Sequence, residues 1–209
     1  MIYEMRTYDL KPRSLPEFIK RFGDAYERRR KFSQLAAFWY TEIGPLNQVV
    51  HVWPYADLAE RGRIRAEAIA GGGWPPNTSE FILDMRSEIM LPWPGSPALP
   101  SGSVGPYFEM RTYTLNPADL AKVPKVWEKP LAARVKLSPV IAQWFSELGG
   151  LNKFVHIWPY RSLDERMAVR KQAIASGTWP PSPAPGEAGY TTVRQETKIL
   201  LAAPFSPLQ

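Results

Sequence analysis

The chain has 209 residues, of which 44% are hydrophobic and 22% are charged, a composition typical of a soluble globular protein with one or two domains. It contains no cysteine, which excludes disulfides, thiolate nucleophiles and cysteine metal sites. No apolar run approaches the roughly 20 residues of a membrane helix, and the strand-like start at Ile2–Tyr8 lacks a signal-peptide pattern. We therefore expect a soluble, cytoplasmic protein.

The formal charge of +6 raises the question of a nucleic-acid partner. The densest basic run, Arg28–Lys31, falls at the end of a predicted helix, where cations complement the helix dipole. No aromatic ribonucleoprotein motif and no zinc-finger spacing accompanies this run. We therefore interpret it as a solvated helix face, and we predict neither a nucleic-acid nor a membrane partner.

An internal repeat decides the predicted architecture. Residues Ile2–Pro76 align without a gap with Tyr107–Pro181, and roughly 34 of the 75 pairs are identical. Two segments are kept best: Glu4–Tyr8 with Glu109–Tyr113, and Leu46–Tyr55 with Leu151–Tyr160. The second of these contains the only two histidines, His51 and His156. The chain is therefore a duplicated unit.

Each copy contains the same elements in the same order. Four strands are predicted in the first copy, at residues 2–10, 36–43, 46–55 and 81–91. Helices are predicted after the first and the third strand, starting near Ser14 and Asp57, and the second helix ends at Gly71–Gly73. The resulting order βαββαβ is that of the ferredoxin-like split motif.

The helix starts carry local signals of two kinds. Capping boxes are predicted at two of them: Ser14 with Glu17, and Ser162 with Glu165. In the second copy Pro124 and Pro130 should bend or shorten the first helix, because proline lacks the amide hydrogen and crowds the preceding turn.

The predicted division of the chain follows the repeat. The first unit covers residues 1–91 and the second covers 107–202, with a Pro-, Gly- and Ser-rich linker at 92–106 and a tail at 203–209. Beyond Pro76 the alignment predicts that the two copies differ by a loop of three residues, after which the fourth strands align again: Arg86 with Arg194 and Glu88 with Glu196.

The E-M-R-T-Y opening, the L-N-x-x-V-H-[VI]-W-P-Y strand and the following L-x-E-R together resemble the NIPSNAP family. The resemblance covers nearly the whole chain, once per half. It implies the dimeric α/β-barrel form of the ferredoxin-like fold, in which the sheets of two domains meet. Because both domains lie in one chain, the expected fold class is α+β: two ferredoxin-like units in an intramolecular pseudo-twofold barrel. The resemblance transfers no catalytic residue.

Strand alternation predicts which side chains share a sheet face. The set containing Tyr3 and Met5 is apolar enough to lie under the helices, so the alternate set would face the other sheet. The first and third strands are neighbours in this motif, and Arg86 and Glu88 could extend their polar face. The candidate site residues are Glu4, Arg6, Tyr8, His51, Trp53 and Arg86, and in the second copy Glu109, Arg111, Tyr113, His156, Trp158 and Arg194.

Charges enclosed between two sheets must form ion pairs, reach water or line a pocket. One interpretation is a polar barrel cavity, in which the arginines bind an anion or enolate oxygen and four residues act as catalytic acids or bases: His51, His156, Glu4 and Glu109. The other interpretation is an ion-pair network that fixes the register of the sheets, with histidines satisfied in the core. Both copies retain these charged residues. This fits the ion-pair network at least as well as the polar cavity, because a single active site rarely needs both copies of its residues.

One histidine per half, without cysteine, makes a metal site improbable. No phosphate loop or nucleotide fingerprint is present. We therefore predict no cofactor, with haem ligation as an alternative because related α/β-barrel families include haem proteins. Trp74 and Trp179, in the W-P-P turns, are predicted to pack in the core.

Two functions of different class follow from these patterns. The first is a cofactor-independent small-molecule enzyme that acts on an aromatic or polyketide-like substrate by proton transfer or oxygenation. The second is a non-catalytic binding or scaffold protein, whose duplicated barrel serves association or ligand carriage. The sequence does not decide whether the protein is an enzyme, and it leaves open whether the fused pair assembles into a homo-oligomer.

Overall fold

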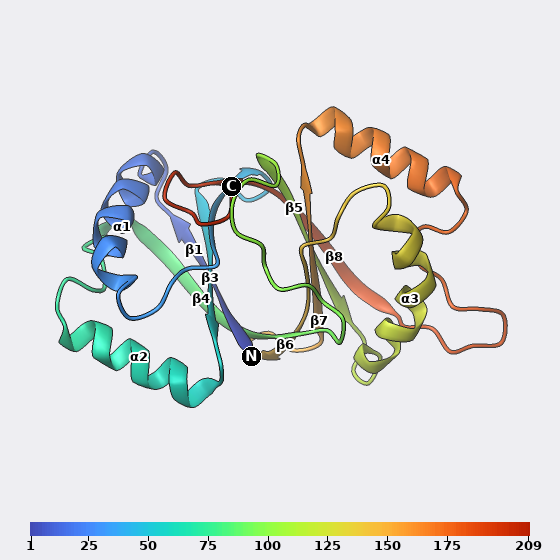
Figure 1. The fold of residues 1–209 in the computed structure, drawn as a ribbon, viewed down its shortest axis with the longest axis horizontal. Helices are drawn as coiled ribbons and strands as arrows, with labels where there is room; N and C mark the ends of the chain where they lie inside the picture. Colours follow the sequence, from blue (N-terminus) through green and yellow to red (C-terminus); the bar gives the residue numbers. More distant parts are fainter.

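The computed structural model describes residues 1–209. The first unit contains β1 (Ile2–Leu10), α1 (Leu15–Arg29), β2 (Ala37–Ile43), β3 (Gln48–Tyr55), α2 (Leu58–Ala70), the short 3-10 helix η1 (Ser79–Phe81) and β4 (Ile82–Pro92). The second contains β5 (Tyr107–Leu115), η2 (Leu120–Lys122), α3 (Val123–Arg134), β6 (Ala142–Leu148), β7 (Lys153–Tyr160), α4 (Leu163–Ala175) and β8 (Thr192–Ala202). Helices α1 and α2 lie at one end of the molecule and α3 and α4 at the other, with the strands between them (Figure 1).

The prolines of α3 shorten it as predicted. This helix has 12 residues, whereas α1 has 15, and a 3-10 turn precedes it. Pro124 lies in the first helical turn, where the missing amide hydrogen is tolerated, and Pro130 lies inside the helix.

The capping prediction is right for α4 and wrong for α1. Ser162 has an extended backbone, and its side chain accepts from the backbone N–H of Glu165 at 3.0 Å. Ser14 instead has helical backbone angles, φ −89° and ψ −12°, and makes no capping bond. Its hydroxyl donates to the carbonyl of Lys11 at 2.6 Å, because the preceding turn directs the side chain backward.

The strands close into one barrel in the order β1-β3-β2-β8-β5-β7-β6-β4. The long last strand of each unit joins the two halves. Strand β4 pairs with β1 over most of its length and with β6 near its end, and β8 pairs likewise with β5 and β2. Closure leaves no free sheet edge. The predicted intramolecular pseudo-twofold barrel is therefore confirmed.

Apolar side chains from both units fill the barrel interior. Tyr3 stacks on Trp144 with ring centroids 4.7 Å apart, and Trp39 lies 5.4 Å from Phe108. The same cluster includes Met5, Val50, Val52, Met90, Met110, Val155, Ile157 and Leu200. The predicted polar barrel cavity is therefore wrong, because the interior is a packed core.

The polar residues predicted for the interior face the helices instead. Strand alternation grouped Glu4, Arg6, Tyr8 and His51 correctly, since each lies on the side of the sheet covered by α1 and α2. The prediction that this polar face lies in the barrel interior was wrong, because both faces of the sheet are buried in a fused barrel. Apolarity therefore does not distinguish the helix side from the interior.

The register of the fourth strands also differs from the prediction. Arg6 lies opposite Ser87, and Arg111 lies opposite Thr197. Glu88 therefore corresponds to Lys198 rather than Glu196, and the loop before β8 is longer than the alignment suggested. Residues directly opposite in a ladder share a face, so Arg86 and Glu88 lie on the other side of the sheet from Arg6.

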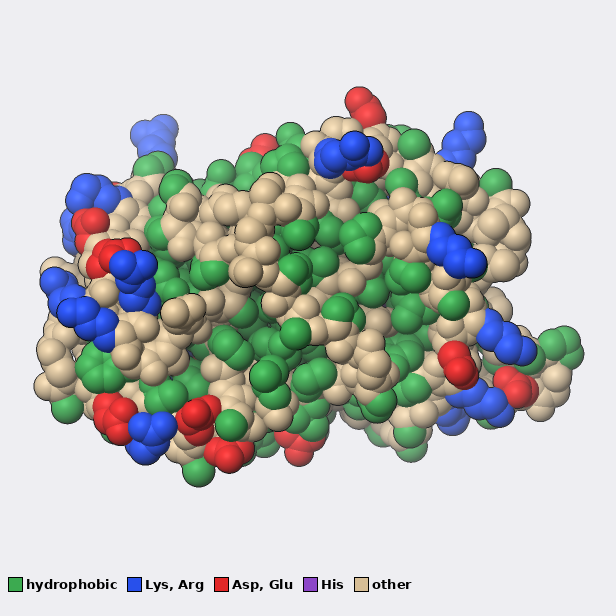
Figure 2. All heavy atoms as spheres, viewed as in Figure 1, with side chains coloured by type: hydrophobic (Ala, Val, Ile, Leu, Met, Phe, Trp, Pro, Cys, Tyr) green, Lys and Arg blue, Asp and Glu red, His purple; other side chains and the backbone are tan.

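The linker and the tail run together across the barrel. The backbone N–H of Val104 donates to Gln209 at 2.6 Å, and Leu208 is fully buried in the interior cluster. Figure 2 shows charged side chains gathered over the helices at the two ends, with few charges in the middle of this face. No helix is long and apolar enough to cross a membrane.

Candidate functional site

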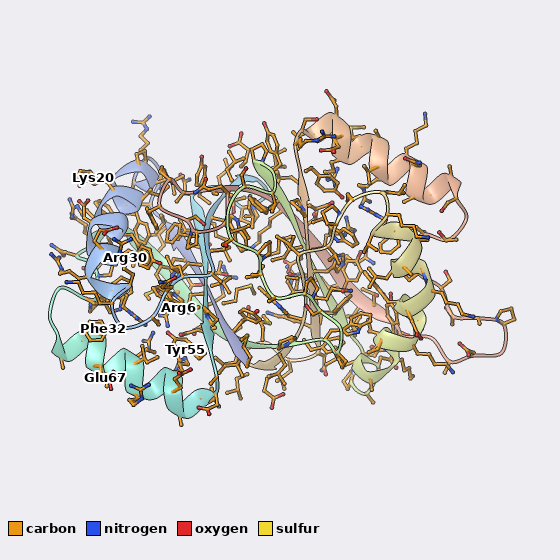
Figure 3. All side chains as sticks on the ribbon, in the orientation of Figure 1. Arg6, Lys20, Arg30, Phe32, Tyr55 and Glu67 are labelled. Atoms are coloured by element: carbon orange, nitrogen blue, oxygen red, sulfur yellow. The ribbon has the colours of Figure 1, made fainter.

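Each unit has a cavity between its sheet and its helices. The first has a volume of about 290 Å³ and the second about 260 Å³. Arg6 and Tyr55 project between the strands and helices of the first unit (Figure 3). The residues that line both cavities in equivalent positions are Arg6, Tyr8, Arg29, His51, Trp53, Tyr55, Arg65, Trp74 and Pro75, matched by Arg111, Tyr113, Arg134, His156, Trp158, Tyr160, Arg170, Trp179 and Pro180.

His51 is fully buried in an aromatic box and is held in one tautomer. The indole N–H of Trp53 donates to Nδ1 at 2.7 Å, so the neutral ring carries its proton on Nε2. The rings of Tyr8 and Phe22 lie 4.9 and 5.1 Å from the imidazole. Burial, with the nearby charge of Arg6, lowers the pKa of His51 to about 3, so the side chain is neutral at pH 7.

His156 repeats this arrangement in the second unit. Trp158 donates to its Nδ1 at 2.6 Å, and Tyr113 and Trp127 lie edge-on at 5.0 and 4.9 Å. Burial, with the charge of Arg111, holds the pKa of His156 well below 6.5. In both histidines Nε2 is buried without a hydrogen-bond partner.

A fully buried carboxylate organises the arginines of the first unit. Oε1 of Glu4 accepts from Arg61 at 2.6 Å, Arg6 at 2.8 Å and Ser87 at 2.8 Å, and Arg65 lies 3.7 Å away. Burial alone would raise the pKa of Glu4, but the hydrogen bond from Arg61 and the charge of Arg6 outweigh it and lower the pKa to about 2. Glu4 is therefore ionised at all ordinary pH values.

The second unit carries the same cluster on Glu109. Its Oε1 accepts from Arg166 at 2.6 Å and from Arg111 at 3.0 Å, and Arg170 lies 3.8 Å away. Thr197 replaces the serine of the first unit at 3.3 Å. Burial raises the pKa of Glu109, but these guanidinium groups lower it overall.

Arg29, at the end of α1, is buried without an acidic partner. Its side chain is 2% exposed and donates to the hydroxyls of Ser33 at 2.8 Å and Tyr55 at 3.2 Å. Its guanidinium lies over the ring of Trp53 at 4.5 Å and near that of Trp74 at 5.7 Å. Burial lowers the pKa of Arg29, yet guanidinium stays protonated in proteins. The first unit thus carries a buried guanidinium without a carboxylate within 4.0 Å, in addition to the three that lie around Glu4.

Arg134 occupies the same position in the second unit. It is 4% exposed, donates to Ser138 at 2.9 Å and Tyr160 at 2.8 Å, and lies over Trp158 at 4.3 Å. It also has no acidic partner within 4.0 Å. The excess of positive charge is therefore a property of both cavities.

The two cavities differ at their floors. Met85, opposite Tyr8, and Ile82 line the first cavity, whereas Gln195, opposite Tyr113, lines the second. Glu109 also reaches the wall of the second cavity. The first cavity is therefore the more apolar and the more positively charged.

The structure brings together most of the predicted site residues. Arg6, Tyr8, His51, Trp53 and their copies line the cavities, Glu109 does so too, and Glu4 lies behind Arg6. Arg86 and Arg194 do not belong to either cavity. Arg86 pairs with Asp9 at 2.9 Å and Arg194 with Glu196 at 2.7 Å, both at exposed positions.

Sequence reasoning missed the residues that the helices and turns contribute. Arg29 and Arg65 come from α1 and α2, and Trp74 comes from the turn after α2. Each is identical in the second copy, as Arg134, Arg170 and Trp179. Identity between the two copies was therefore the signal in the sequence that could have indicated these residues. No group of three or more His, Cys, Asp or Glu side chains is placed to hold a metal ion.

Comparison with known proteins agrees with this architecture. The NIPSNAP family model matches the chain twice, over residues 3–97 and 108–207. A NipSnap homologue of Dictyostelium discoideum is 26% identical over 202 residues, covering 95% of this chain and 86% of that protein. An uncharacterised NIPSNAP-like domain protein of Burkholderia xenovorans is 40% identical, with a TM-score of 0.44, and covers 47% of this chain and 90% of that chain.

A more distant neighbour extends over both units. The solved structure of a putative monooxygenase from Fusobacterium nucleatum has a TM-score of 0.63 at 8% identity, covering 97% of this chain and 92% of that chain. This likeness concerns the fold alone. The fold and cavities thus define a fused pair of ferredoxin-like units in a closed α/β barrel. Within that class, the chain belongs to the NIPSNAP family.

Proposed function

We propose that this protein binds small organic anions with a flat apolar body, such as arylcarboxylates, in two cavities, one in each unit. The observation that carries the proposal is Arg29, a buried guanidinium that lines a cavity and has only neutral hydrogen-bond partners. A buried charge without a counter-ion is costly. A ligand carboxylate would supply the missing charge with charge-assisted hydrogen bonds.

The walls of the cavity suit the rest of such a ligand. Trp53, Trp74 and Phe22 present aromatic surface to the first cavity. A volume of about 290 Å³ is near the lower end of the range for small-molecule sites. These features support the binding alternative drawn from the sequence, with ligand carriage as its role.

The ionisation of the candidate acids and bases also favours binding over catalysis. A general base works best when its pKa lies near the working pH. The pKa of His51 is about 3 and that of Glu4 about 2, and Nδ1 of His51 already accepts from Trp53. Neither side chain is poised to remove a proton at pH 7.

The side chains present do not fit haem ligation. An axial histidine offers a ring-nitrogen lone pair to iron. In His51 the Nδ1 lone pair accepts from Trp53 and the Nε2 position carries the proton, inside a box formed by Tyr8, Phe22 and Phe38. The same tautomer is fixed in His156.

The test compares 2-naphthoate with its neutral isostere 2-naphthamide, by calorimetry and by tryptophan fluorescence. We expect naphthoate to bind at least 10-fold more tightly than naphthamide, because only the carboxylate neutralises the buried arginine. The Arg29→Met and Arg134→Met variants should each weaken one naphthoate site by about 10- to 100-fold, the loss of a charge-assisted hydrogen bond of roughly 1.5–3 kcal/mol.

Methionine is the matched replacement because it keeps the length of the apolar stem. Removing either arginine leaves no buried carboxylate unpaired, because the partners of Arg29 and Arg134 are hydroxyl groups, so both variants should remain folded. Arg63→Met, at an exposed position on α2 whose partner is Glu67, is the control and should leave binding unchanged. Equal affinities for naphthoate and naphthamide, or binding untouched by both buried-arginine variants, would contradict the proposal.

Oxygenation of an aromatic substrate is the second candidate. The first cavity is lined by the guanidinium groups of Arg6, Arg29 and Arg65, donors suited to an enolate or phenolate oxygen. A solved neighbour with a TM-score of 0.57 at 9% identity is described as an anthrone oxidase-like protein, a likeness of fold alone.

Anthrone is therefore the substrate for its test, with oxygen consumption as the readout. If the protein oxygenates anthrone, one O₂ should be consumed for each anthrone converted to anthraquinone and water. The rate should exceed that of heat-denatured protein and should fall at least 10-fold in the double variant Arg29→Met/Arg134→Met, which removes the buried guanidinium from both cavities. A rate equal to that with denatured protein would contradict oxygenation and would leave binding as the remaining function.

A further inference from the structure

A cavity in the second unit lies outside the two arginine-lined cavities. In the first unit a side chain fills the equivalent space, and the backbone contacts shared by the two units identify that side chain. The N–H of Trp93, after β4, donates to the carbonyl of Gln143 at 2.8 Å, and the N–H of Ala203, after β8, donates to that of Phe38 at 3.0 Å. The segments that follow β4 and β8 therefore occupy equivalent places.

A second pair of contacts fixes the register of these segments. The hydroxyl of Ser96 accepts from the N–H of Gln143 at 3.1 Å, and that of Ser206 accepts from the N–H of Phe38 at 2.9 Å. Counting back one residue from each serine, Gly95 takes the place of Phe205.

In the first unit Phe205 fills this place completely. Its ring lies 4.9 Å from Phe38 and 5.9 Å from Phe22. It also packs against Gly23 of α1, where an added Cβ would lie 2.7 Å from the ring. The absence of a side chain at this glycine makes the close approach possible.

In the second unit the packing positions have changed. Gly95 replaces Phe205, Gln143 replaces Phe38 and Glu128 replaces Gly23, whereas Trp127 replaces Phe22 and Trp93, in place of Ala203, lies 6.1 Å from it. A cavity of about 370 Å³ remains between α3, β6 and the segment after β4. A cavity of about 150 Å³ can hold a benzene ring, so this one has room for a substituted ring.

Gln143 places an unsatisfied amide in the wall of this cavity. It lies opposite His156 in the β6–β7 ladder, so its side chain is on the side of the sheet that α3 covers. The residue is 1% exposed, and its Nε2 has no hydrogen-bond partner. Buried amides are normally paired, so this arrangement calls for an acceptor from outside the chain.

We infer that this cavity binds a small neutral aromatic carbonyl compound. The carbonyl oxygen accepts from the side-chain N–H of Gln143 once the terminal amide turns toward the cavity, since Nε2 is buried without a partner in the unliganded structure. The ring lies against Trp93 and Leu131. The rim disfavours an anion, because Lys125 is paired with Glu187 at 2.9 Å whereas Glu128 has no cationic partner. The ligand class thus differs from that of the arginine-lined cavities.

The test uses acetophenone and ethylbenzene, which have similar shape but differ in the carbonyl group. The side-chain amide signal of Gln143 is followed by ¹⁵N NMR during titration of the wild-type protein. Acetophenone should shift that signal saturably and bind at least 10-fold more tightly than ethylbenzene. An amide signal unmoved by acetophenone would mean that the cavity holds water only, and would overturn the inference.

Two variants locate the binding independently of that signal. Gln143→Phe restores the side chain of the first unit and should weaken acetophenone binding at least 10-fold while thermal unfolding checks the fold. Arg134→Met, in the arginine-lined cavity, should leave acetophenone affinity unchanged. Acetophenone binding that survives Gln143→Phe, or that is lost in Arg134→Met, would place the ligand elsewhere and overturn the inference. Neither result would affect the naphthoate test of the arginine cavities.

Discussion

Replacing Glu4 by glutamine is expected to lower the free energy of unfolding by about 3–5 kcal/mol, the usual effect of removing one partner from a buried ion pair. The carboxylate is fully buried and holds Arg6 and Arg61 at 2.8 and 2.6 Å, with Arg65 at 3.7 Å. Glutamine preserves the shape of the side chain but leaves these guanidinium groups without their only counter-charge. Urea unfolding at pH 7 measures the difference.

Two further substitutions provide the comparison. Glu109→Gln removes the equivalent carboxylate of the second unit and should cost a similar amount. Glu17→Gln breaks the pair with Arg21, whose side chains are 49% and 34% exposed, and should change the free energy of unfolding by less than about 1 kcal/mol. A loss below 1 kcal/mol for Glu4→Gln would show that solvent screens the buried cluster, contrary to the geometry described above.

Mild acid is expected to destabilise the protein strongly because of its two buried histidines. The pKa of His51 is about 3 in the folded state, against a usual 6.5, and that of His156 is also well below 6.5. Below pH 6.5 the unfolded chain therefore binds protons that the folded chain does not, and stability falls as the pH falls toward the folded pKa. Between pH 6.5 and pH 5 His51 should cost on the order of 2 kcal/mol, and His156 should add to this loss in the same direction.

Urea unfolding at several pH values tests this dependence. Few carboxylates titrate between pH 6.5 and pH 5, so the slope in that window reports on the histidines. His51→Gln and His156→Gln cannot titrate, and each should remove about half of the slope whatever its effect on stability at pH 7. An unchanged slope in both variants would mean that the histidines take up protons in the folded state.

The duplication, the order of the elements and the family could be predicted from the amino-acid sequence, because these depend on local patterns and on identity between the copies. Alternation along β1 and β3 also grouped Glu4, Arg6, Tyr8 and His51 on one face. That inference needs only the two-residue period of a strand and the pairing of neighbouring strands. The identity of Arg29 and Arg134 could also be read from the alignment of the two copies, although no local pattern indicated that their side chains line the cavities.

The side of the sheet on which that face lies depends on tertiary packing and could not be predicted from the amino-acid sequence. Both faces of each sheet are buried, one by the opposite sheet and one by helices, so hydrophobicity alone does not distinguish them. The charged face lies under α2 because that helix brings Arg61 and Arg65 to Glu4, a contact that depends on how the helix packs. The cavity beside Gln143 likewise depends on a segment from the other unit, which long-range strand pairing brings to that place.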